Sequence, residues 1–447
     1  MGRTLRQRKR KKQLCQISSN TTAEKVDQTI IKLLKWMTAN GWKSTCNLTP
    51  YYFKSTGRGL MTKKLIKNDD ILVKIPGSLL ITIKAVYDSS FGWVFSRGKT
   101  FTTQQVLSSF LVFEKHQELK SFWFSYISSL PSEIYSPVFC PVDFVNIMPQ
   151  ELREQVISLK SNIVGQYEEV RNSLSIQDIC KHCGTLLVDI YTIDEFMWAW
   201  FIVNSRAVYI SPDRNTDHSI SLSDSNCLAL APYLDMLNHS DVVQVQAFIN
   251  DSDDSYQIKT MVPFKRNDQV FIHYGAHSNM KLLLDYGFIL PKNKNDVIKL
   301  NCDDVFKTII NIFPHKQSSS KQKYNFLKSH DLLSNTCCSY DGLSWELKIL
   351  IFVLLSPEHM ETKTIQRKVF SSDFSIEEEK DISIIGKALL EKKLVLFRHE
   401  LFVITKYFDS LRDEFTRECY KLIIKMYENY IFVLDNVIET FSQCISV

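Results

Sequence analysis

The segment Pro232-Tyr-Leu-Asp-Met-Leu-Asn-His-Ser240 brings carboxylate, amide and imidazole side chains together in an otherwise apolar neighbourhood. Such a concentration of polar groups is typical of a ligand-binding site, where a few polar atoms fix the orientation of a ligand. The structural alternative is a capped turn, in which Asp235 and Asn238 only satisfy nearby backbone groups. Composition alone leaves both interpretations open.

The chain that follows this segment alternates apolar and polar residues, which predicts strands. Val243–Ile249 and Tyr256–Val262 flank the turn-rich stretch Asn250–Ser255, as the two strands of a β-hairpin would. A third strand is expected at Gln269–Tyr274. This part of the chain should therefore form a β-hairpin followed by a further strand.

A short helix is predicted after the third strand. Ser278 is placed to cap its start, and Gly287 is placed to end it in the left-handed conformation. Tyr286 should then lie in the last turn, beside the strand ends, and Tyr274 at the end of the strand. Tyrosines in such positions are more often core residues than catalysts, and His273 is expected to be a packing or surface residue.

Upstream, Thr56-Gly-Arg-Gly-Leu60 lies between β-prone runs. Two glycines allow the backbone to turn sharply or to approach a ligand closely. A lone GxG is usually a plain turn, and the third glycine and following helix of a dinucleotide site are missing. The β-prone run Ile71–Ile75 follows and ends at Pro76.

Helical patterns surround these strands. Ala23–Asn40 is amphipathic and stops at Gly41, and Thr192–Glu195 has the capping-box pattern of a helix start. Helical patterns also dominate between the two strand regions and again after Pro291. The organisation expected is a basic disordered tail at 1–22, a folded unit at 23–290 with a helical insert at about 100–205, and a helical domain at 300–447.

Composition and charge exclude several classes of protein. Hydrophobic residues make up 45% of the chain. A membrane-spanning helix needs about 18 consecutive apolar residues, and no apolar run approaches that length, so no membrane association is expected. The formal charge of +5 owes much to the basic run at Arg8–Lys12, and the remainder carries no footprint for sequence-specific nucleic-acid binding. That run is interpreted as a solvated tail, a nuclear import signal or a contact to acidic chromatin.

Cysteine usage indicates the compartment. Eleven cysteines, an odd number without a secretion signal, favour reduced thiols in the nucleus and cytoplasm. The tightest group, Cys180-Lys-His-Cys183, could begin a zinc site, but no second CxxC pair follows at zinc-finger spacing. We therefore expect thiols on a helix or loop and no metal.

Three motifs, in this order, resemble the SET-domain methyltransferases, specifically the branch of the Rubisco large-subunit lysine methyltransferase. They are Thr56–Leu60, Asp235–Ser240 and Gln269–Phe288, with Asn204-Ser-Arg206 as a weaker fourth. The resemblance covers roughly residues 25–447. It implies an α+β fold, in which a SET β-fold of small sheets with a knot-like C-terminal closure carries a helical insert and is followed by an all-helical, substrate-binding C-terminal domain.

The resemblance also implies roles for individual residues, with S-adenosyl-L-methionine as the cofactor. Those implied to bind the cofactor are Thr56, Gly57, Arg58, Asn238, His239, Tyr286, Gly287 and Phe288. Tyr286 corresponds to the active-site tyrosine of the family, and Arg206, Asp235 and Tyr274 would line the substrate side. One departure is Ile210, where some members carry a second arginine near the substrate.

The function implied is protein-lysine N-methylation by a monomer, on histone tails (H3/H4) or on another nuclear or cytosolic protein. Histidine methylation is an alternative, because the branch also contains a histidine methyltransferase, which lacks a tyrosine at the position of Tyr286. A non-catalytic chromatin-binding module is the alternative from another class.

Overall fold

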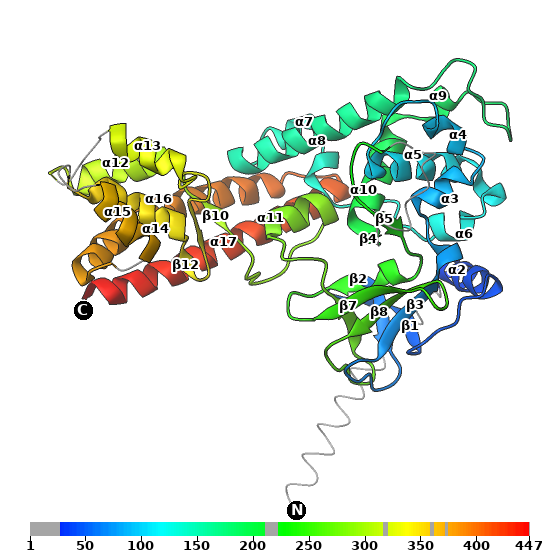
Figure 1. Cartoon of the computed structure of the whole chain (residues 1–447), viewed down its shortest axis with the longest axis horizontal. Coiled ribbons are helices and arrows are strands. Elements are labelled where there is room, and N and C mark those ends of the chain that lie inside the picture. Colours follow the sequence, from blue (N-terminus) through cyan, green and yellow to red (C-terminus); the bar gives the residue numbers. More distant parts are fainter. Residues whose placement is uncertain (1–26, 211–221, 316–320, 358–361, 372–373, 447) are drawn as a thin grey trace, which may run out of the picture.

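The computed structural model describes residues 27–210, 222–315, 321–357, 362–371 and 374–446. The predicted basic tail, 1–22, lies outside these ranges. Strands and the helices inserted between them form one end of the molecule, a small helical lobe forms the other, and two long helices connect the two (Figure 1). The α+β class expected from the sequence is confirmed.

The first described helix, α2 (Gln28–Ala39), agrees with the amphipathic pattern. Asp27 caps it by accepting a hydrogen bond from the Thr29 backbone N–H at 2.9 Å. Gly41 follows the helix with a φ of 88°, which is the conformation expected of a glycine at a helix end. The helix begins later than the pattern predicts because the capping carboxylate stands at Asp27.

Two small sheets contain most of the strands at this end of the molecule. The four-stranded sheet has the order β1 (Leu48–Phe53), β2 (Gly57–Thr62), β9 (Gln269–Ile272), β6 (Asn238–His239). The three-stranded sheet has the order β3 (Ile71–Pro76), β8 (Ser255–Thr260), β7 (Val245–Asn250). The predicted hairpin is confirmed as the antiparallel pair β7 and β8. Because β6 pairs in parallel with β9, which pairs with β2, all three sequence motifs share one sheet.

The helices between β3 and β6 form the insert. Its longer members are α5 (Thr103–His116), α8 (Gln150–Arg171) and α10 (Ile193–Arg206). Thr192 caps α10 as predicted, by accepting from the Glu195 backbone N–H. Shorter elements are α3 (Ile83–Tyr87), α4 (Gly92–Phe95), α6 (Phe124–Ile127), α7 (Val142–Val145), α9 (Leu187–Ile190), β4 (Ala207–Tyr209) and β5 (Leu228–Leu230). The end of α10 carries Arg206 to the sheet.

The resemblance implied an all-helical C-terminal domain. The C-terminal region is mainly helical, but it also contains strands. It contains a three-stranded sheet of β10 (Ile298–Lys299), β11 (Cys337–Ser339) and β12 (Gly342–Leu343). Strands of two or three residues are too short to show a periodicity, which explains why the sequence did not reveal them. The helices are α12 (Cys302–Ile312), α13 (Lys321–Ser329), α14 (Trp345–Leu355), α15 (Thr362–Ser371), α16 (Ile376–Phe408) and α17 (Glu414–Ser446).

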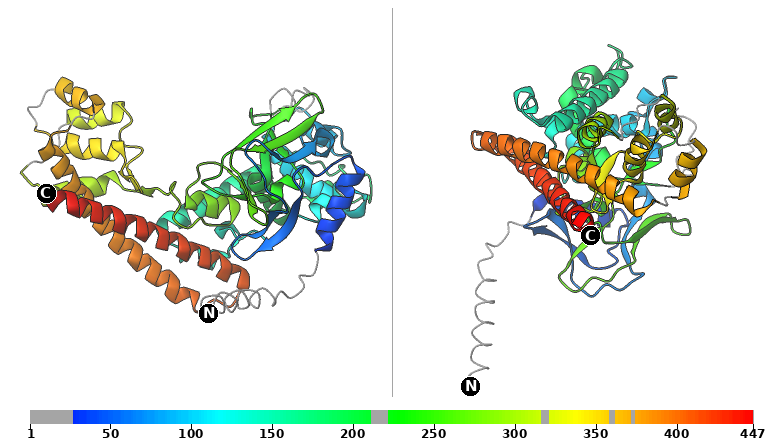
Figure 2. Two further views of the ribbon diagram at one scale, coloured as in Figure 1. Left: turned by 90° about the horizontal axis from the view of Figure 1, so that it is seen from below. Right: turned by 90° about the vertical axis from the view of Figure 1, so that its left-hand side faces the viewer.

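Helices α16 and α17 lie side by side along the length of the molecule (Figure 2). The N-terminal half of α17 packs on the insert, where the Tyr420 hydroxyl donates to the Phe144 carbonyl at 2.7 Å. The rings of Tyr135 and Phe415 stack nearby at 5.5 Å. The helical region is thus joined to the insert by specific contacts. None of the helices described has the length and apolar character needed to cross a bilayer.

Candidate active site

A strained turn leads the chain into the central motif. Tyr233 has a φ of 70°, a conformation that costs a residue with a side chain about 1–3 kcal/mol. Its hydroxyl donates to the Leu48 carbonyl at 2.8 Å, and its ring lies 4.8 Å from that of Trp42. These buried contacts hold the turn, which continues into the 3-10 helix η5 (Leu234–Met236) and then into β6.

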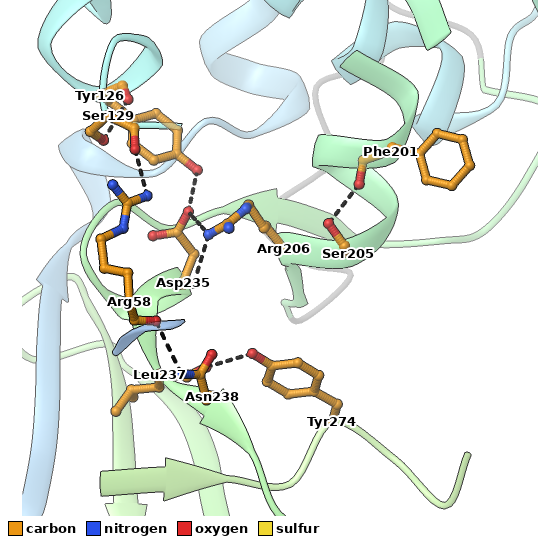
Figure 3. A network of polar contacts seen from close by, with 10 residues as sticks. All are labelled: Arg58, Tyr126, Ser129, Phe201, Ser205, Arg206, Asp235, Leu237, Asn238 and Tyr274. Carbon is orange, nitrogen blue, oxygen red and sulfur yellow. Dashed lines mark hydrogen bonds and ion pairs between the residues drawn. The ribbon is translucent and has the colours of Figure 1, made fainter. Parts of the chain in front are cut away.

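The carboxylate of Asp235 is the centre of a buried polar network (Figure 3). Its side chain is 2% exposed and accepts a hydrogen bond from the Tyr126 hydroxyl at 3.0 Å. Arg206 Nη1, at the end of α10, donates to the Asp235 carbonyl at 2.9 Å and lies 3.3 Å from the carboxylate. Both contacts to the carboxylate end on its Oδ2 atom, which therefore has two donors inside the protein.

A second guanidinium adjoins the network. Arg58 Nη2 donates to the Ser129 carbonyl at 2.6 Å (Figure 3). Its Nη1 lies 3.7 Å from the Asp27 carboxylate. Burial lowers the pKa of Arg58, and the neighbouring charge of Arg206 acts in the same direction, while Asp235 opposes it. Asp235 is therefore the central counter-charge for two cationic side chains.

A second polar cluster, called the amide cradle below, consists of the side chains of Thr56, Asn238 and Gln269 and the backbone at the start of β2. Asn238 Nδ2 donates to the carbonyl of Arg58 at 3.0 Å and to that of Thr56 at 3.4 Å. The Thr56 hydroxyl donates to Gln269 Oε1 at 2.9 Å. Gly57 begins the strand with a φ of 69°, in the region that favours glycine. The first and second motifs therefore meet through main-chain atoms.

Gly59 leaves room for the two amides of this cradle. A Cβ at this position would lie 2.6 Å from Gln269 Nε2 and 2.8 Å from Asn238 Nδ2. Gln269 Nε2 is buried and has no hydrogen-bond partner among the described residues. A buried donor without a partner is costly, so an acceptor from a bound ligand would stabilise this site.

Stacked rings line the adjoining part of the site. The ring of Tyr274 lies 5.1 Å from that of His239 and 5.5 Å from that of Tyr286, with interplanar angles of 25° and 26°. Phe288 meets Tyr274 and Tyr286 edge-on, at 6.4 and 6.1 Å. Such rings have few rotatable bonds and form rigid walls.

The position of Tyr286 is set by the helix end that the sequence predicted. The helix α11 (Asn279–Lys281) continues as the π-helix η6 (Leu282–Tyr286), and Gly287 ends it with a φ of 74°. A Cβ at Gly287 would approach the Tyr135 backbone N at 3.2 Å. Asn279 clamps the returning chain, since its side chain exchanges two hydrogen bonds with the backbone of Leu290 at 2.8 and 2.9 Å. The clamp keeps Tyr286 and Phe288 at the sheet edge.

The two site tyrosines differ in their hydroxyl contacts. The Tyr274 hydroxyl donates to the Leu237 carbonyl at 2.6 Å (Figure 3). The Tyr286 hydroxyl has no hydrogen-bond partner in the part of the chain that the structure describes. Burial raises the pKa of both phenols, so both are protonated at neutral pH. Tyr286 can therefore donate or accept a hydrogen bond with a ligand.

His239 is a neutral, buried imidazole. Its Nδ1 accepts from the Tyr274 backbone N–H at 3.1 Å, which places the ring proton on Nε2. That Nε2 is buried and unpaired within the described ranges. Burial lowers the pKa of His239 from 6.5 to about 4, and His273, whose ring lies 5.3 Å away, adds to the effect.

This depressed pKa predicts that acid destabilises the fold. In the folded state His239 binds its proton less readily than in the unfolded state, so its contribution to stability is complete above pH 6.5 and is lost as the pH falls towards 4. The loss should reach up to about 3 kcal/mol. We expect the free energy of unfolding of His239→Gln, followed by urea titration, to fall less over this range than that of the parent.

The exposed His315 offers a matched control. His315→Gln should retain the full pH dependence of the parent. If both variants lose stability equally between pH 6.5 and 4, His239 does not carry this acid sensitivity.

Comparison with known proteins agrees with this geometry. Residues 57–275 match the SET domain. Over 349 residues the chain is 33% identical to SET domain-containing protein 4 of Homo sapiens, a match that covers 77% of this chain and 76% of that protein. The chain belongs to the SET-domain family. The resemblance carried by the three motifs is thereby confirmed.

Two further similarities extend over this SET-domain chain. It is 27% identical over 278 residues to the actin-histidine N-methyltransferase of Gallus gallus, covering 62% of this chain and 45% of that protein. The crystal structure of the SET domain of LSMT bound to lysine and AdoHcy has the same fold, with a TM-score of 0.61 and 18% identity, over 94% of this chain and 92% of the other. Because the structural match covers 94% of this chain, it includes the helical C-terminal region.

The residues predicted for the site fall into two groups in this SET-domain protein. The first, around the amide cradle and the stacked rings, is Thr56, Gly57, Asn238, His239, Tyr274, Tyr286, Gly287 and Phe288. Arg206 and Asp235 lie in the buried network, where the side chain of Arg58 also points (Figure 3). Direct contact of Asp235 with a substrate stays a prediction, since its carboxylate is occupied by protein partners.

Sequence reasoning missed two residues of the site. Tyr126 lies 109 positions before Asp235, inside the insert, and no local pattern connects them. Gln269 was placed at the start of a strand, but its amide was not assigned to the site. A polar side chain beginning a buried strand was the one available signal.

Proposed function

We propose that this SET-domain methyltransferase transfers a methyl group from S-adenosylmethionine to the ε-amine of a lysine in a protein substrate. The observation that carries the proposal is the phenol of Tyr286, which has no hydrogen-bond partner among the described residues and stands among stacked rings beside the amide cradle. A hydroxyl among aromatic rings that no described residue binds suits an alkyl amine.

The residues present suit this cofactor. S-adenosylmethionine, when bound, supplies the methyl group on a positively charged sulfonium, and it also carries a carboxylate, an amine and an adenine. Gln269 Nε2 and His239 Nε2 are buried donors without partners among the described residues, so they can donate hydrogen bonds to acceptor atoms of such a ligand. Asn238 and Thr56 would hold the polar end, and Gly59 leaves the room that the Asn238 amide needs.

The main contribution of the protein to this reaction is alignment. Displacement at a sulfonium requires the amine, the methyl carbon and the sulfur to be collinear, and holding reactants in such a geometry is worth about 7–11 kcal/mol in favourable cases. Tyr274, Tyr286 and Phe288 supply walls that restrict how a side chain enters. The Tyr286 hydroxyl would orient the amine.

The lysine amine must lose its proton before it attacks, because its ordinary pKa is about 10.4. Burial in an apolar slot, beside a positive sulfonium, lowers that pKa and sends the proton to water. Asp235 is not a suitable base, since Tyr126 and Arg206 occupy its carboxylate. The protonated phenols are not bases either. The proposal therefore needs no dedicated general base.

Histidine methylation is the second candidate, favoured by the similarity to the actin-histidine N-methyltransferase. The presence of Tyr286 supports lysine, because its phenol takes up space that a methyl-accepting imidazole would need. A non-catalytic chromatin-binding module is supported less, since the cradle and the unpaired phenol would then have no purpose.

We also propose that the helical region holds the protein substrate. In its support, Val395, Phe402 and Val403 of α16 are 69%, 66% and 38% exposed and recur at helical spacing. Apolar side chains that gather on one helix face are typical of a protein-binding surface. Histones and other proteins of the nucleus and cytoplasm are the proposed substrates.

Transfer of a labelled methyl group decides between these functions. Full-length protein would be incubated with methyl-labelled S-adenosylmethionine and nuclear or cytosolic extract, and the labelled residue identified by mass spectrometry. We expect label on lysine Nε, and none with Asn238→Ala, which removes an amide of the cradle. Label on histidine would support the second candidate, and the absence of both labelling and cofactor binding would contradict a methyltransferase.

A further inference from the structure

A cluster of metal-binding side chains lies in the helical insert, outside the site described above. The Nε2 atom of His116 and the Sγ atoms of Cys180 and Cys183 all lie within 4.8 Å of one another. His116 Nε2 and Cys183 Sγ are 3.2 Å apart. Within the described ranges this is the one group of three such side chains that could hold a metal ion.

The spacing suits a tetrahedral zinc site. Zinc binds thiolate sulfur at about 2.3 Å and imidazole nitrogen at about 2.0–2.1 Å, so ligand atoms at tetrahedral angles lie about 3.6–3.8 Å apart. His116 Nε2 and Cys183 Sγ, at 3.2 Å, are slightly closer than this, and the other two pairs lie within 4.8 Å, so the three ligand atoms are close to tetrahedral spacing. Thiolate and imidazole ligands also favour zinc over magnesium or calcium, which prefer oxygen. Side-chain shifts of a fraction of an ångström would complete the geometry.

Backbone hydrogen bonds fold the loop that carries Cys180 and Cys183 into a tight turn. Gly184, directly after Cys183, has a φ of 76°, and its N–H donates to the Cys180 carbonyl at 2.8 Å. The Cys180 N–H in turn donates to the Thr185 carbonyl at 2.8 Å. This turn places both sulfur atoms within 4.8 Å of each other and of the imidazole nitrogen of His116.

An ion pair between Arg97 and Asp178 holds the same loop in place. Arg97 donates two hydrogen bonds of 2.6 Å to the Asp178 carboxylate, whose side chain is 5% exposed. Asp178 also accepts from the Ser175 backbone N–H at 2.7 Å. A site held in place before the ion arrives loses less conformational entropy on binding.

We propose that His116, Cys180 and Cys183 bind one zinc ion, with water as the fourth ligand, and that this ion ties the end of α5 to the loop after α8. His116 is the last residue of α5 and stands 67 positions before Cys183. The two thiols release their protons to solvent as zinc binds, and no oxidation occurs. The role is structural and is separate from methyl transfer.

Metal analysis of the full-length protein tests the proposal. We expect about one zinc ion per chain after purification without chelators. Cys180→Ser/Cys183→Ser should lose it, and His116→Gln should bind zinc at least about 10–100-fold more weakly, since even an outer-shell partner is worth that much. A chelator should lower the melting temperature of the parent but not that of the double serine variant.

Cys337 and Cys338 provide a control, because they too are two thiols in one short segment, one of them buried, and lie outside the cluster. Cys337→Ser/Cys338→Ser should keep its zinc. The proposal is overturned if the folded parent binds no zinc, if the Cys180 and Cys183 variants keep it, or if thiol counting shows these two cysteines joined in a disulfide.

Discussion

Tyr286→Phe is expected to lower the turnover number on the order of 10²-fold or more while leaving the affinity for S-adenosylmethionine unchanged. The substitution removes one oxygen atom and keeps the ring, so the stack with Tyr274 and Phe288 should survive. The hydroxyl has no hydrogen-bond partner among the described residues, so its loss should not cost folding stability. Its effect should therefore appear in the rate of methyl transfer.

Rate and binding must be measured separately to test this. Turnover would be followed with labelled cofactor, and cofactor affinity by calorimetry. Tyr256→Phe is the control, because Tyr256 is a buried tyrosine of β8 outside the stack of rings. Activity of Tyr286→Phe within about twofold of the parent would show that the phenol is only a wall of the slot.

Asp235→Asn should reduce the free energy of unfolding by about 3–5 kcal/mol, even though the side chain changes little in shape. The guanidinium of Arg206 pairs with this carboxylate, which is 2% exposed, and that of Arg58 lies close enough to be stabilised by its charge. Removing its charge leaves the two cations near each other without their central counter-charge. The amide oxygen of asparagine can still accept from Tyr126 and Arg206 at the position of Oδ2, so the expected loss comes from the missing charge.

Urea denaturation of the parent and of Asp235→Asn measures this loss in the free energy of unfolding. Asp253→Asn is the control, because Asp253 pairs with Lys74 at the surface, where both side chains are more than a third exposed. Exposed pairs contribute about 0–1 kcal/mol, so this variant should remain close to the parent. Equal stability losses in the two variants would contradict the central role of Asp235.

Much of the fold was accessible from local patterns. The hairpin of β7 and β8 could be predicted because alternating residues flank a run of turn formers. The end of the helix before Gly287 could be predicted because a left-handed residue there is almost always glycine. The small sheet of β10, β11 and β12 could not, because strands of two or three residues leave no period to detect.

The sequence by itself determined the elements whose cause is local: the caps at Thr192 and Ser278, the glycines that turn the chain, and the order of three motifs typical of the SET family. Only the tertiary structure decided which side chains meet. Tyr126 reaches Asp235 across 109 positions, and His116 reaches Cys183 across 67. Backbone preference acts over a few neighbouring residues, whereas such contacts depend on how whole helices and sheets pack, and no single segment encodes that packing.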